Sequence, residues 1–330
     1  MHAINEAIVL GAGNWGCVLA ELIARNVPVR LWTLNDQLRD ELKGAWRCQG
    51  RLSGSRGFPL VIETKFASSF DQDKTLLVIA VPSSAVRSAA AEVARSCDRP
   101  LVLCVSKGFD AEEFCTPSEL IRRELPGASV VSLTGPTIAN EVGQGLPTVG
   151  VLSSDDLACL AMVKAALRND VIRFATGRNP AHHELCAALK GIIAIGVGMA
   201  EGLGLGVNCQ AVIMTEGIAE MAHVASFFDI PREVVYGLSG VGDVLTTCIS
   251  PDSRNRRLGA LLGKGCKLQD ALEEVHMTVE GVAMSRTIET LWALDVSIPL
   301  INFINSAIFG RVSDLRAGFT SLLMRNIIEG

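Results

Sequence analysis

A chain of 330 residues with a net charge of -5 and a pI near 5.6 lacks the basic character that is typical of nucleic-acid-binding proteins. Its ten cysteines form no CxxC pair, which favours reduced thiols in a cytoplasmic protein over a disulfide framework or a zinc site. The N-terminus has no signal-peptide pattern, and the apolar run at 191–200 is too short to cross a membrane. We therefore expect no nucleic acid or membrane among the partners.

Short apolar runs alternate with helical patterns in the first half of the chain. Near-continuous apolar strands separated by helices predict a parallel sheet that is covered on both faces. Residues 1–179 are therefore expected to form a doubly wound, Rossmann-like α/β domain. The predicted strands are 7–10, 29–32, 76–81, 101–105, 129–133, 148–152 and 171–175.

Helical patterns replace the strands after residue 179. The segment 183–200 is apolar almost all round, which predicts a helix that is buried on every side. Residues 180–330 are therefore expected to form a second domain, all-helical and substrate-binding. Its other predicted helices lie near 208–228, 254–263, 281–294 and 298–309.

A glycine-rich turn, GAGNWG at 11–16, follows the first predicted strand and opens a helix. Gly11 permits the tight turn, Gly13 lets a pyrophosphate approach the backbone, and Gly16 allows the helix to pack closely on the strand. The motif is weak alone, but its place in an α/β pattern predicts a dinucleotide site.

The choice between NAD and NADP stays open. An acidic residue is expected at the end of the second strand to bind the ribose, but this position reads Thr33, Leu34 and Asn35. Asp36 could turn in to replace it. Arg30 could instead attract a 2′-phosphate, or it could face away from the cofactor.

Two lysines occupy apolar surroundings. Lys107 follows the strand at 101–105, at the edge of the sheet where ligands bind, although a solvated lysine would fit equally well. Lys190 is the only cation in the apolar helix, where a buried ammonium must be paired or have its pKa lowered. Such a lysine can transfer a proton to or from a substrate; the alternative is that its side chain extends to the surface.

The stretch GLSGVGDVLTTCISPDSRNRR places one acid, Asp243, among glycines and apolar residues and then becomes basic. We expect Asp243 to accompany a lysine in a dry pocket. Arg254 and Asn255 open a helix, where guanidinium and backbone amides could bind a phosphate together. Read alone, the RNRR cluster fits a solvated basic face as well.

The chain resembles the NAD(P)-dependent sn-glycerol-3-phosphate dehydrogenases, most closely the bacterial type. The resemblance implies a Rossmann domain joined to a helical domain, usually as a homodimer, that interconverts dihydroxyacetone phosphate and glycerol 3-phosphate without a metal. The motifs that carry it, from about residue 7 to the early 280s, are GAGNWG, SKGF, LTGPTIANEV with GLPT, ALKGIIAIGVGMAEGLGLGVN, GVGDVLTTC, SRNRRLG and VEGV.

The resemblance also implies roles for individual residues. Lys190 matches the family's catalytic lysine, Lys107 a second active-site lysine, and Asp243 the acid beside them. The residues that match substrate contacts are Gly135, Thr137, Thr247, Ser253, Arg254 and Asn255. Those expected at the cofactor are Gly11, Gly13, Asn14, Trp15, Gly16, Lys107, Ala139, Arg254 and Glu280.

Three departures from the family pattern leave the substrate open. Gly191 replaces an asparagine that follows the catalytic lysine, which suggests extra room or a different group in its place. The segment 47–59 lacks the family's usual sequence, and HHEL at 182–185 replaces a glycine-rich entry. We expect His182 and His183 at the surface, with polarisation of a substrate as the alternative.

Two further readings compete with a glycerol-3-phosphate dehydrogenase. One is a paralogue that reduces another small phosphorylated or phosphonylated ketone or aldehyde. The other is a nucleotide-binding regulator that has lost catalysis. Retention of the lysines, Asp243, Arg254 and Asn255 argues against this second reading.

Overall fold

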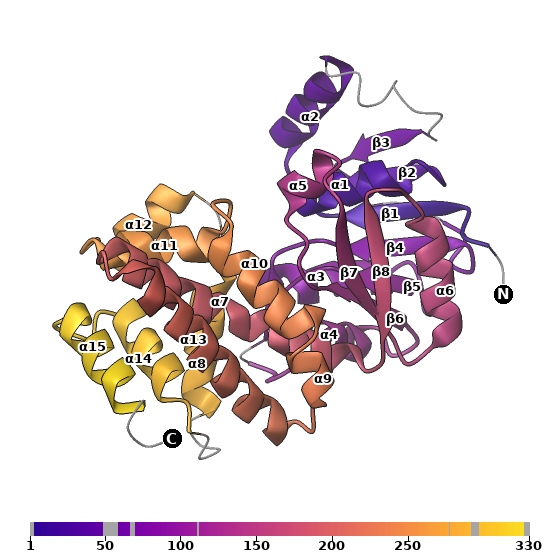
Figure 1. The fold of residues 1–330 in the computed structure, drawn as a ribbon. Helices are drawn as coiled ribbons and strands as arrows, with labels where there is room; N and C mark the ends of the chain where they lie inside the picture. The colour runs from indigo at the N-terminus through magenta and orange to yellow at the C-terminus, as the bar shows by residue number, and fades with distance from the viewer. Residues whose placement is uncertain are drawn as a thin grey trace. The chain divides into compact units, whose positions relative to one another are not determined.

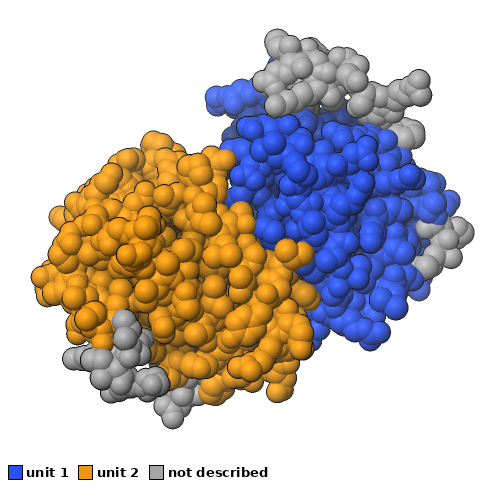
Figure 2. All heavy atoms as spheres, in the orientation of Figure 1, with its two compact units in different colours: residues 1–106, 116–181 blue, residues 107–115, 182–330 orange. Residues whose placement is uncertain are grey.

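The computed structural model describes residues 3–48, 59–66, 70–110, 112–276, 278–291 and 297–326. The chain divides into two compact units, shown in different colours in Figure 2. Unit 1 comprises Met1–Ser106 and Thr116–Ala181, and unit 2 comprises Lys107–Cys115 and His182–Gly330. The short segment 107–115 thus belongs with the later residues, although the strand before it lies in unit 1.

Unit 1 is built on an 8-stranded sheet with the order β3-β2-β1-β4-β5-β6-β7-β8 (Figure 1). The order reverses between β1 and β4, and ligands of such sheets bind at this reversal, outside the carboxyl ends of the strands. The strands are β1 (Glu6–Leu10), β2 (Val29–Trp32), β3 (Leu60–Glu63), β4 (Thr75–Ile79), β5 (Leu101–Cys104), β6 (Ser129–Thr134), β7 (Thr148–Ser153) and β8 (Ile172–Gly177).

The sequence predicts a parallel sheet, but the sheet is mixed. Strand β7 pairs antiparallel with β6. The helix that joins them, α5 (Ala139–Gly143), has 5 residues. It spans only about 8 Å at 1.5 Å per residue, too little to return the chain along the sheet. The edge strand β3 was also missed: its apolar run, Leu60 to Ile62, is only three residues long, and the strand is partly exposed.

Both faces of the sheet are buried at its central strands, as in β4 and β5. Alternate residues of the central strands, such as Val9, Val78 and Leu103, join one core cluster with α1 (Asn14–Ile23) and α6 (Leu157–Ala166). The helices α3 (Val86–Ala94) and α4 (Pro117–Glu124) bury residues outside this cluster. The doubly wound α/β class is therefore confirmed.

Unit 2 is helical in its described residues, apart from one bridge between Asp110 and Cys115. The predicted helices are confirmed, with ends that differ by a few residues. The helices are α7 (Pro180–Gly202), α8 (Gly206–Phe227), α9 (Arg232–Val235), the π-helix η2 (Leu238–Gly242), α10 (Asp243–Ile249), α11 (Arg254–Gly263), α12 (Leu268–Val275), α13 (Glu280–Leu291), α14 (Pro299–Ile308) and α15 (Leu315–Asn326).

Helix α7 forms the centre of unit 2. Every residue from 183 to 200 is buried, which confirms the prediction of a helix covered on all sides. Among the described residues α7 is the one helix long and apolar enough to cross a membrane, but 89% of its most apolar window is buried inside the protein. A Cβ on Gly198 would lie 2.1 Å from the Arg256 carbonyl oxygen, so α7 and α11 touch backbone to backbone.

The N-terminus of α14 is capped from another helix. Glu220 on α8 is 4% exposed, and its carboxylate oxygens accept hydrogen bonds from the backbone N–H groups of Leu300 (2.7 Å) and Ile301 (2.8 Å). These bonds satisfy two donors that a helix leaves unpaired at its start. Burial nevertheless raises the pKa of Glu220 to about 7, and the two backbone bonds oppose that rise only in part.

This raised pKa predicts a pH-dependent stability. Because the pKa of Glu220 is higher in the folded than in the unfolded protein, its protonated form stabilises the folded state at low pH. This stabilisation is lost as pH rises through about 7. We expect the advantage of the wild type over Glu220→Gln in unfolding free energy to fall by roughly 2 to 3 kcal/mol between pH 5 and pH 8. Urea unfolding at both pH values measures it. A constant difference would mean that Glu220 keeps its charge throughout.

Candidate active site

Two lysines share one buried carboxylate in unit 2. Nζ of Lys190 donates a hydrogen bond to Oδ1 of Asp243, and Nζ of Lys107 donates to Oδ2 at 2.9 Å. Asp243 is 2% exposed and Lys190 is 8% exposed. Each carboxylate oxygen therefore faces one ammonium, and we call these three residues the Lys–Asp–Lys cluster.

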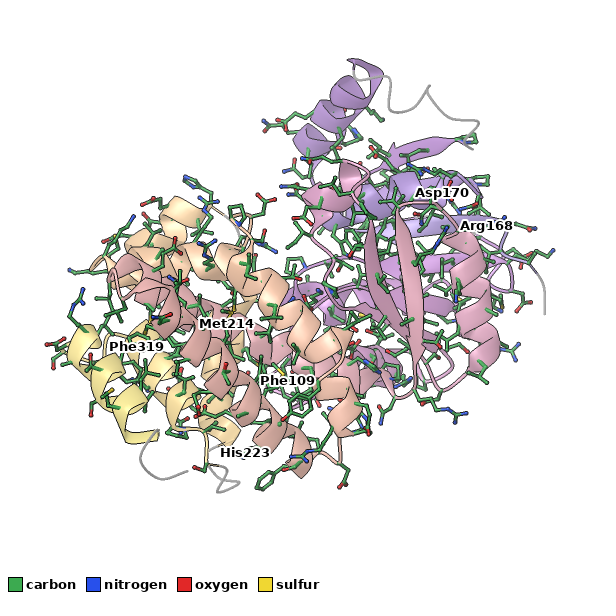
Figure 3. The ribbon with its side chains drawn as sticks, viewed as in Figure 1. Phe109, Arg168, Asp170, Met214, His223 and Phe319 are labelled. Atoms are coloured by element: carbon green, nitrogen blue, oxygen red, sulfur yellow. The ribbon has the colours of Figure 1, made fainter. Side chains whose placement is uncertain are left out.

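The three residues come from separate parts of the chain. Lys190 lies in the middle of α7, and Asp243 is the first residue of α10, directly after the π-helix η2. Lys107 opens the segment 107–115, whose Phe114 ring lies 6.3 Å, centroid to centroid, from the ring of Phe228 at the end of α8. The centroids of Phe109 and Phe114 are 5.1 Å apart, and Figure 3 shows Phe109 among the helices of this unit.

Electrostatics make Lys190 a group that can exchange a proton near neutral pH. Burial lowers its pKa from 10.5 to about 7; Asp243 opposes the shift, and the second ammonium, Lys107, adds to it. A lysine with a pKa near the working pH can act as both acid and base. The alternative of a surface-reaching Lys190 is wrong, because the side chain is buried and paired.

Thr247 lies one turn after Asp243 and is 6% exposed. Its hydroxyl donates a hydrogen bond of 2.6 Å to the backbone carbonyl of Asp243. The predicted substrate residue thus lies beside the cluster, with its hydroxyl proton bound inside α10.

The start of α11 brings together the other polar residues predicted for the substrate. Ser253 caps the helix, since its Oγ accepts a hydrogen bond of 3.2 Å from the N–H of Arg256. The guanidinium of Arg254 donates to the Thr278 carbonyl at 2.9 Å. Arg256 forms two hydrogen bonds with Glu201, so the basic cluster is not a uniformly solvated face.

Gly191 lies against the start of α13. A Cβ on Gly191 would approach Cα of Gly281 to 2.8 Å and Nδ2 of Asn255 to 3.4 Å. Asn255 in turn accepts a hydrogen bond of 3.0 Å from the N–H of Gly281. Of the two explanations for Gly191, the structure favours a different group: the Gly281 backbone, held by Asn255, occupies the space.

The glycine turn of unit 1 has the geometry that a dinucleotide needs. Gly11 has a positive φ of 111°, and a Cβ there would lie 2.5 Å from the Ala80 carbonyl oxygen. A Cβ on Gly16 would lie 1.9 Å from the Gly11 carbonyl oxygen, whereas one on Gly13 would meet nothing within 4 Å. The turn therefore packs tightly on the protein side and leaves Gly13 approachable, which fits a pyrophosphate at the start of α1.

The residues beside this turn add to the fit. Asn14 is the first residue of α1, and the buried Nε1 of Trp15 has no hydrogen-bond partner among the described residues. Such a donor can serve a bound ligand. Glu280, also predicted at the cofactor, is the first residue of α13 in unit 2.

The loop after β6 holds three more predicted residues in unit 1. Gly135 has a φ of 96°, and the hydroxyl of Thr137 donates to its carbonyl at 3.2 Å. Ala139 begins α5, which packs on α1: a Cβ on Gly143 would lie 3.3 Å from Val18. This loop and the glycine turn therefore precede two helices that touch.

The end of β2 carries no carboxylate that is free to bind a ribose. Arg30 forms hydrogen bonds of 3.2 and 3.1 Å with Glu6, so it is engaged inside the sheet. Asn35 accepts from the N–H of Leu38 and caps α2 (Asp36–Cys48), while Asp36 forms an ion pair with Arg39. Neither Arg30 nor Asp36 marks a preference between the cofactors.

The expectation for HHEL at 182–185 is wrong at one position. His183 is 7% exposed, and its Nδ1 shares a hydrogen bond of 2.8 Å with the hydroxyl of Ser239. Two adjacent histidines at the start of a helix are typical of a polar surface, so the sequence did not predict the burial of His183. Most of the other divergent segment, 47–59, lies outside the described residues.

Comparisons with known proteins place both halves of the chain in one family. A model described as the N-terminus of NAD-dependent glycerol-3-phosphate dehydrogenase matches residues 6–160, and the model of its C-terminus matches residues 180–317. The glycerol-3-phosphate dehydrogenase (NAD(P)+) of Agathobacter rectalis is 34% identical over 304 residues, which cover 91% of this chain and 90% of that protein. Its counterpart from Listeria monocytogenes serotype 4a is 35% identical, with 92% of each chain covered.

A solved structure supports the same assignment. The crystal structure of glycerol-3-phosphate dehydrogenase from Coxiella burnetii matches with a TM-score of 0.87 and 27% identity. The match covers 97% of this chain and 99% of that one. The chain belongs to the NAD-dependent glycerol-3-phosphate dehydrogenase family.

Proposed function

We propose that this protein interconverts dihydroxyacetone phosphate and sn-glycerol 3-phosphate with NAD(H) or NADP(H). The observation that carries the proposal is the Lys–Asp–Lys cluster, in which a buried lysine has a pKa of about 7. The relatives carry the corresponding name at about 34% identity. Oxidation of NADH and NADPH by purified protein with dihydroxyacetone phosphate is the direct test.

Lys190 acts as the general acid in reduction. When bound, the nicotinamide supplies the hydride that reduces the substrate carbonyl carbon. Nζ of Lys190 gives its proton to the carbonyl oxygen, which becomes the alcohol oxygen of the product, and takes a proton back in the reverse direction. Asp243 holds the ammonium in place, and Lys107 favours release of the proton by repulsion between the two cations.

Arg254, with the capped start of α11, binds the phosphate. A guanidinium and backbone N–H groups at a helix start suit a dianion. Ser253 already caps this start, and Asn255 holds it to α13. Gly135 and Thr137 belong to a loop that contacts the substrate, as the family resemblance implies.

Residues of unit 1 hold the cofactor. Gly11, Gly13 and Gly16 shape the turn for the pyrophosphate, and Asn14, Trp15 and Ala139 lie on the two helices that start beside it. The family resemblance also implies cofactor contacts for Lys107, Arg254 and Glu280. We also propose a cytoplasmic homodimer, which analytical ultracentrifugation of the purified protein would test for its oligomeric state.

The pKa of Lys190 predicts opposite pH profiles for the two directions. Reduction needs the protonated lysine, so its kcat/KM should fall about tenfold per pH unit above pH 7. Oxidation needs the neutral amine, so its kcat/KM should fall as pH drops below 7. Initial rates from pH 5.5 to 9 in both directions measure the midpoints. Two profiles that bend in the same direction would contradict this role.

Arg254→Ala should raise the KM for the phosphorylated substrate more than tenfold with kcat little changed. The loss corresponds to more than about 1.4 kcal/mol of binding free energy. Lys264→Ala is the matched control, because it removes one positive charge from the other end of α11. An equal rise in KM in both variants would mean that net charge, and not a specific grip, attracts the substrate.

One observation keeps a second candidate function open. The Gly281 backbone takes the place of the expected asparagine side chain beside Lys190. A paralogue that reduces another small phosphorylated or phosphonylated ketone or aldehyde would show tight cofactor binding with slow turnover of dihydroxyacetone phosphate. A catalytically silent regulator would bind the cofactor and turn over none of these compounds.

A further inference from the structure

Two side chains without a part in the proposed chemistry are hydrogen-bonded inside unit 2. Nδ1 of His183 and Oγ of Ser239 lie 2.8 Å apart. The two residues are 7% and 1% exposed. Either atom can be the donor, because the role of the ring nitrogen depends on the imidazole tautomer. In such a dry place the loss of one partner is costly for the other.

This hydrogen bond joins the same elements as the ion pair of the active site. His183 and Lys190 are almost two turns apart on α7, so they project from nearly the same face of the helix. Ser239 lies in η2, and Asp243 follows η2 directly as the first residue of α10. Two parallel links therefore connect α7 to the η2–α10 segment: His183 with Ser239, and Lys190 with Asp243.

The hydrogen bond between His183 and Ser239 acts on η2, a single π-helical turn. A single π-helical turn is rare and occurs most often at functional sites. On one side η2 packs closely against the end of α9, since a Cβ on Gly240 would lie 1.9 Å from the Val235 carbonyl oxygen. On α7 the turn is held by the imidazole of His183. These two contacts fix the direction in which the chain leaves η2, and Asp243 is the next residue.

We propose that His183 and Ser239 form a positioning pair, which holds Asp243 within hydrogen-bonding distance of Lys190 and so sustains turnover. The proposal deepens the proposed function and rests on it where turnover is the readout. His183 itself touches no reacting atom; it acts through Ser239, η2 and Asp243. Its effect is therefore expected in kcat, not in the KM that reports phosphate binding.

Kinetics of the full-length protein test the pair. His183→Leu should lower kcat about tenfold with KM changed less than twofold, because the bond to Ser239 is lost while the volume is largely kept. Ser239→Ala should act in the same direction, and the double variant should be no slower than the slower single variant. His183→Asn should restore most of the rate, because its amide can reach the Ser239 hydroxyl from the position of Nδ1.

A second readout does not depend on turnover. The ¹³Cε resonance of Lys190, assigned by its loss in Lys190→Met, should titrate near pH 7 in the wild type. In His183→Leu the midpoint should move by roughly half a pH unit or more, since the distance to Asp243 changes, and in His183→Asn it should not. If His183→Leu does not fold, Ser239→Ala gives the same readouts after loss of a single hydroxyl.

The outcomes separate the two proposals. If the wild type does not reduce dihydroxyacetone phosphate, the proposed function fails, and the titration alone decides the positioning pair. If His183→Leu melts at a lower temperature but keeps the wild-type kcat and Lys190 midpoint, the pair is merely structural and the inference is overturned. Additive effects of the two single substitutions on kcat would overturn it as well.

Discussion

Lys190→Met is expected to lower turnover in both directions by about a hundredfold to ten-thousandfold, the range that general acid–base catalysis contributes. Met has nearly the length of Lys but no proton to give. It also leaves the Asp243 carboxylate with one ammonium, Lys107, in place of two. Steady-state rates of NADH and NADPH oxidation with dihydroxyacetone phosphate measure the loss.

Cofactor affinity separates a chemical defect from a folding defect in this variant. The glycine turn is formed by residues 11–16 of unit 1, and Lys190 is not among the residues proposed to contact the cofactor. We therefore expect the Kd for NADH, measured by quenching of tryptophan fluorescence, to change less than about threefold, or under ~0.7 kcal/mol. Normal turnover in Lys190→Met would exclude Lys190 as the acid.

Lys190→Arg tests whether charge or proton transfer matters. Arginine keeps a positive charge beside Asp243 but does not deprotonate in proteins. We expect this variant to be nearly as slow as Lys190→Met. Substantial recovery of kcat would mean that the cation at position 190 only polarises the carbonyl, and that another group or water supplies the proton.

The parts of this structure that follow from local pattern could be predicted, and those that depend on distant contacts could not. Apolar runs revealed seven strands because buried strands are continuous in sequence. The edge strand β3 has only a short apolar run and is partly exposed, and the antiparallel direction of β7 depends on the length of α5, which periodicity does not report. A lone cation in an apolar helix revealed Lys190.

The sequence indicates the partners of Lys190 less clearly than it indicates Lys190 itself. Asp243 was conspicuous as a single acid among glycines, but nothing local says that Lys107, far away in the sequence, shares its carboxylate. His183 could have been found from its spacing to Lys190, which places both on one face of α7. The contact of Gly191 with Gly281 has no sequence signal other than the glycines themselves.

Gly191→Asn, which would restore the residue that the family resemblance leads one to expect, should destabilise this protein by about 2 to 3 kcal/mol. Its Cβ would lie 2.8 Å from Cα of Gly281, closer than real Cβ contacts come, and the obstacle is backbone. Overpacking of this kind costs about 1 to 3 kcal/mol, and the better helix propensity of asparagine offsets only a few tenths. Urea unfolding measures the change.

The same substitution should also damage the site. To admit a side chain at position 191, the start of α13 must move away, and the hydrogen bond of 3.0 Å between the Gly281 N–H and Asn255 would lengthen or break. Asn255 is then free to leave its position at the start of α11. We expect the KM for dihydroxyacetone phosphate to rise at least about tenfold, in parallel with the loss of stability.

Gly44→Asn is the matched control, because it makes the same change inside α2, where a Cβ would meet nothing within 4 Å. There the higher helix propensity of asparagine should leave stability unchanged or slightly raised. A smaller destabilisation in Gly191→Ala than in Gly191→Asn would show that bulk at the Gly281 contact sets the cost. If Gly191→Asn is as stable as the wild type and has a lower KM, the Gly281 backbone does not fill this space, and the missing asparagine is a true loss of a substrate contact.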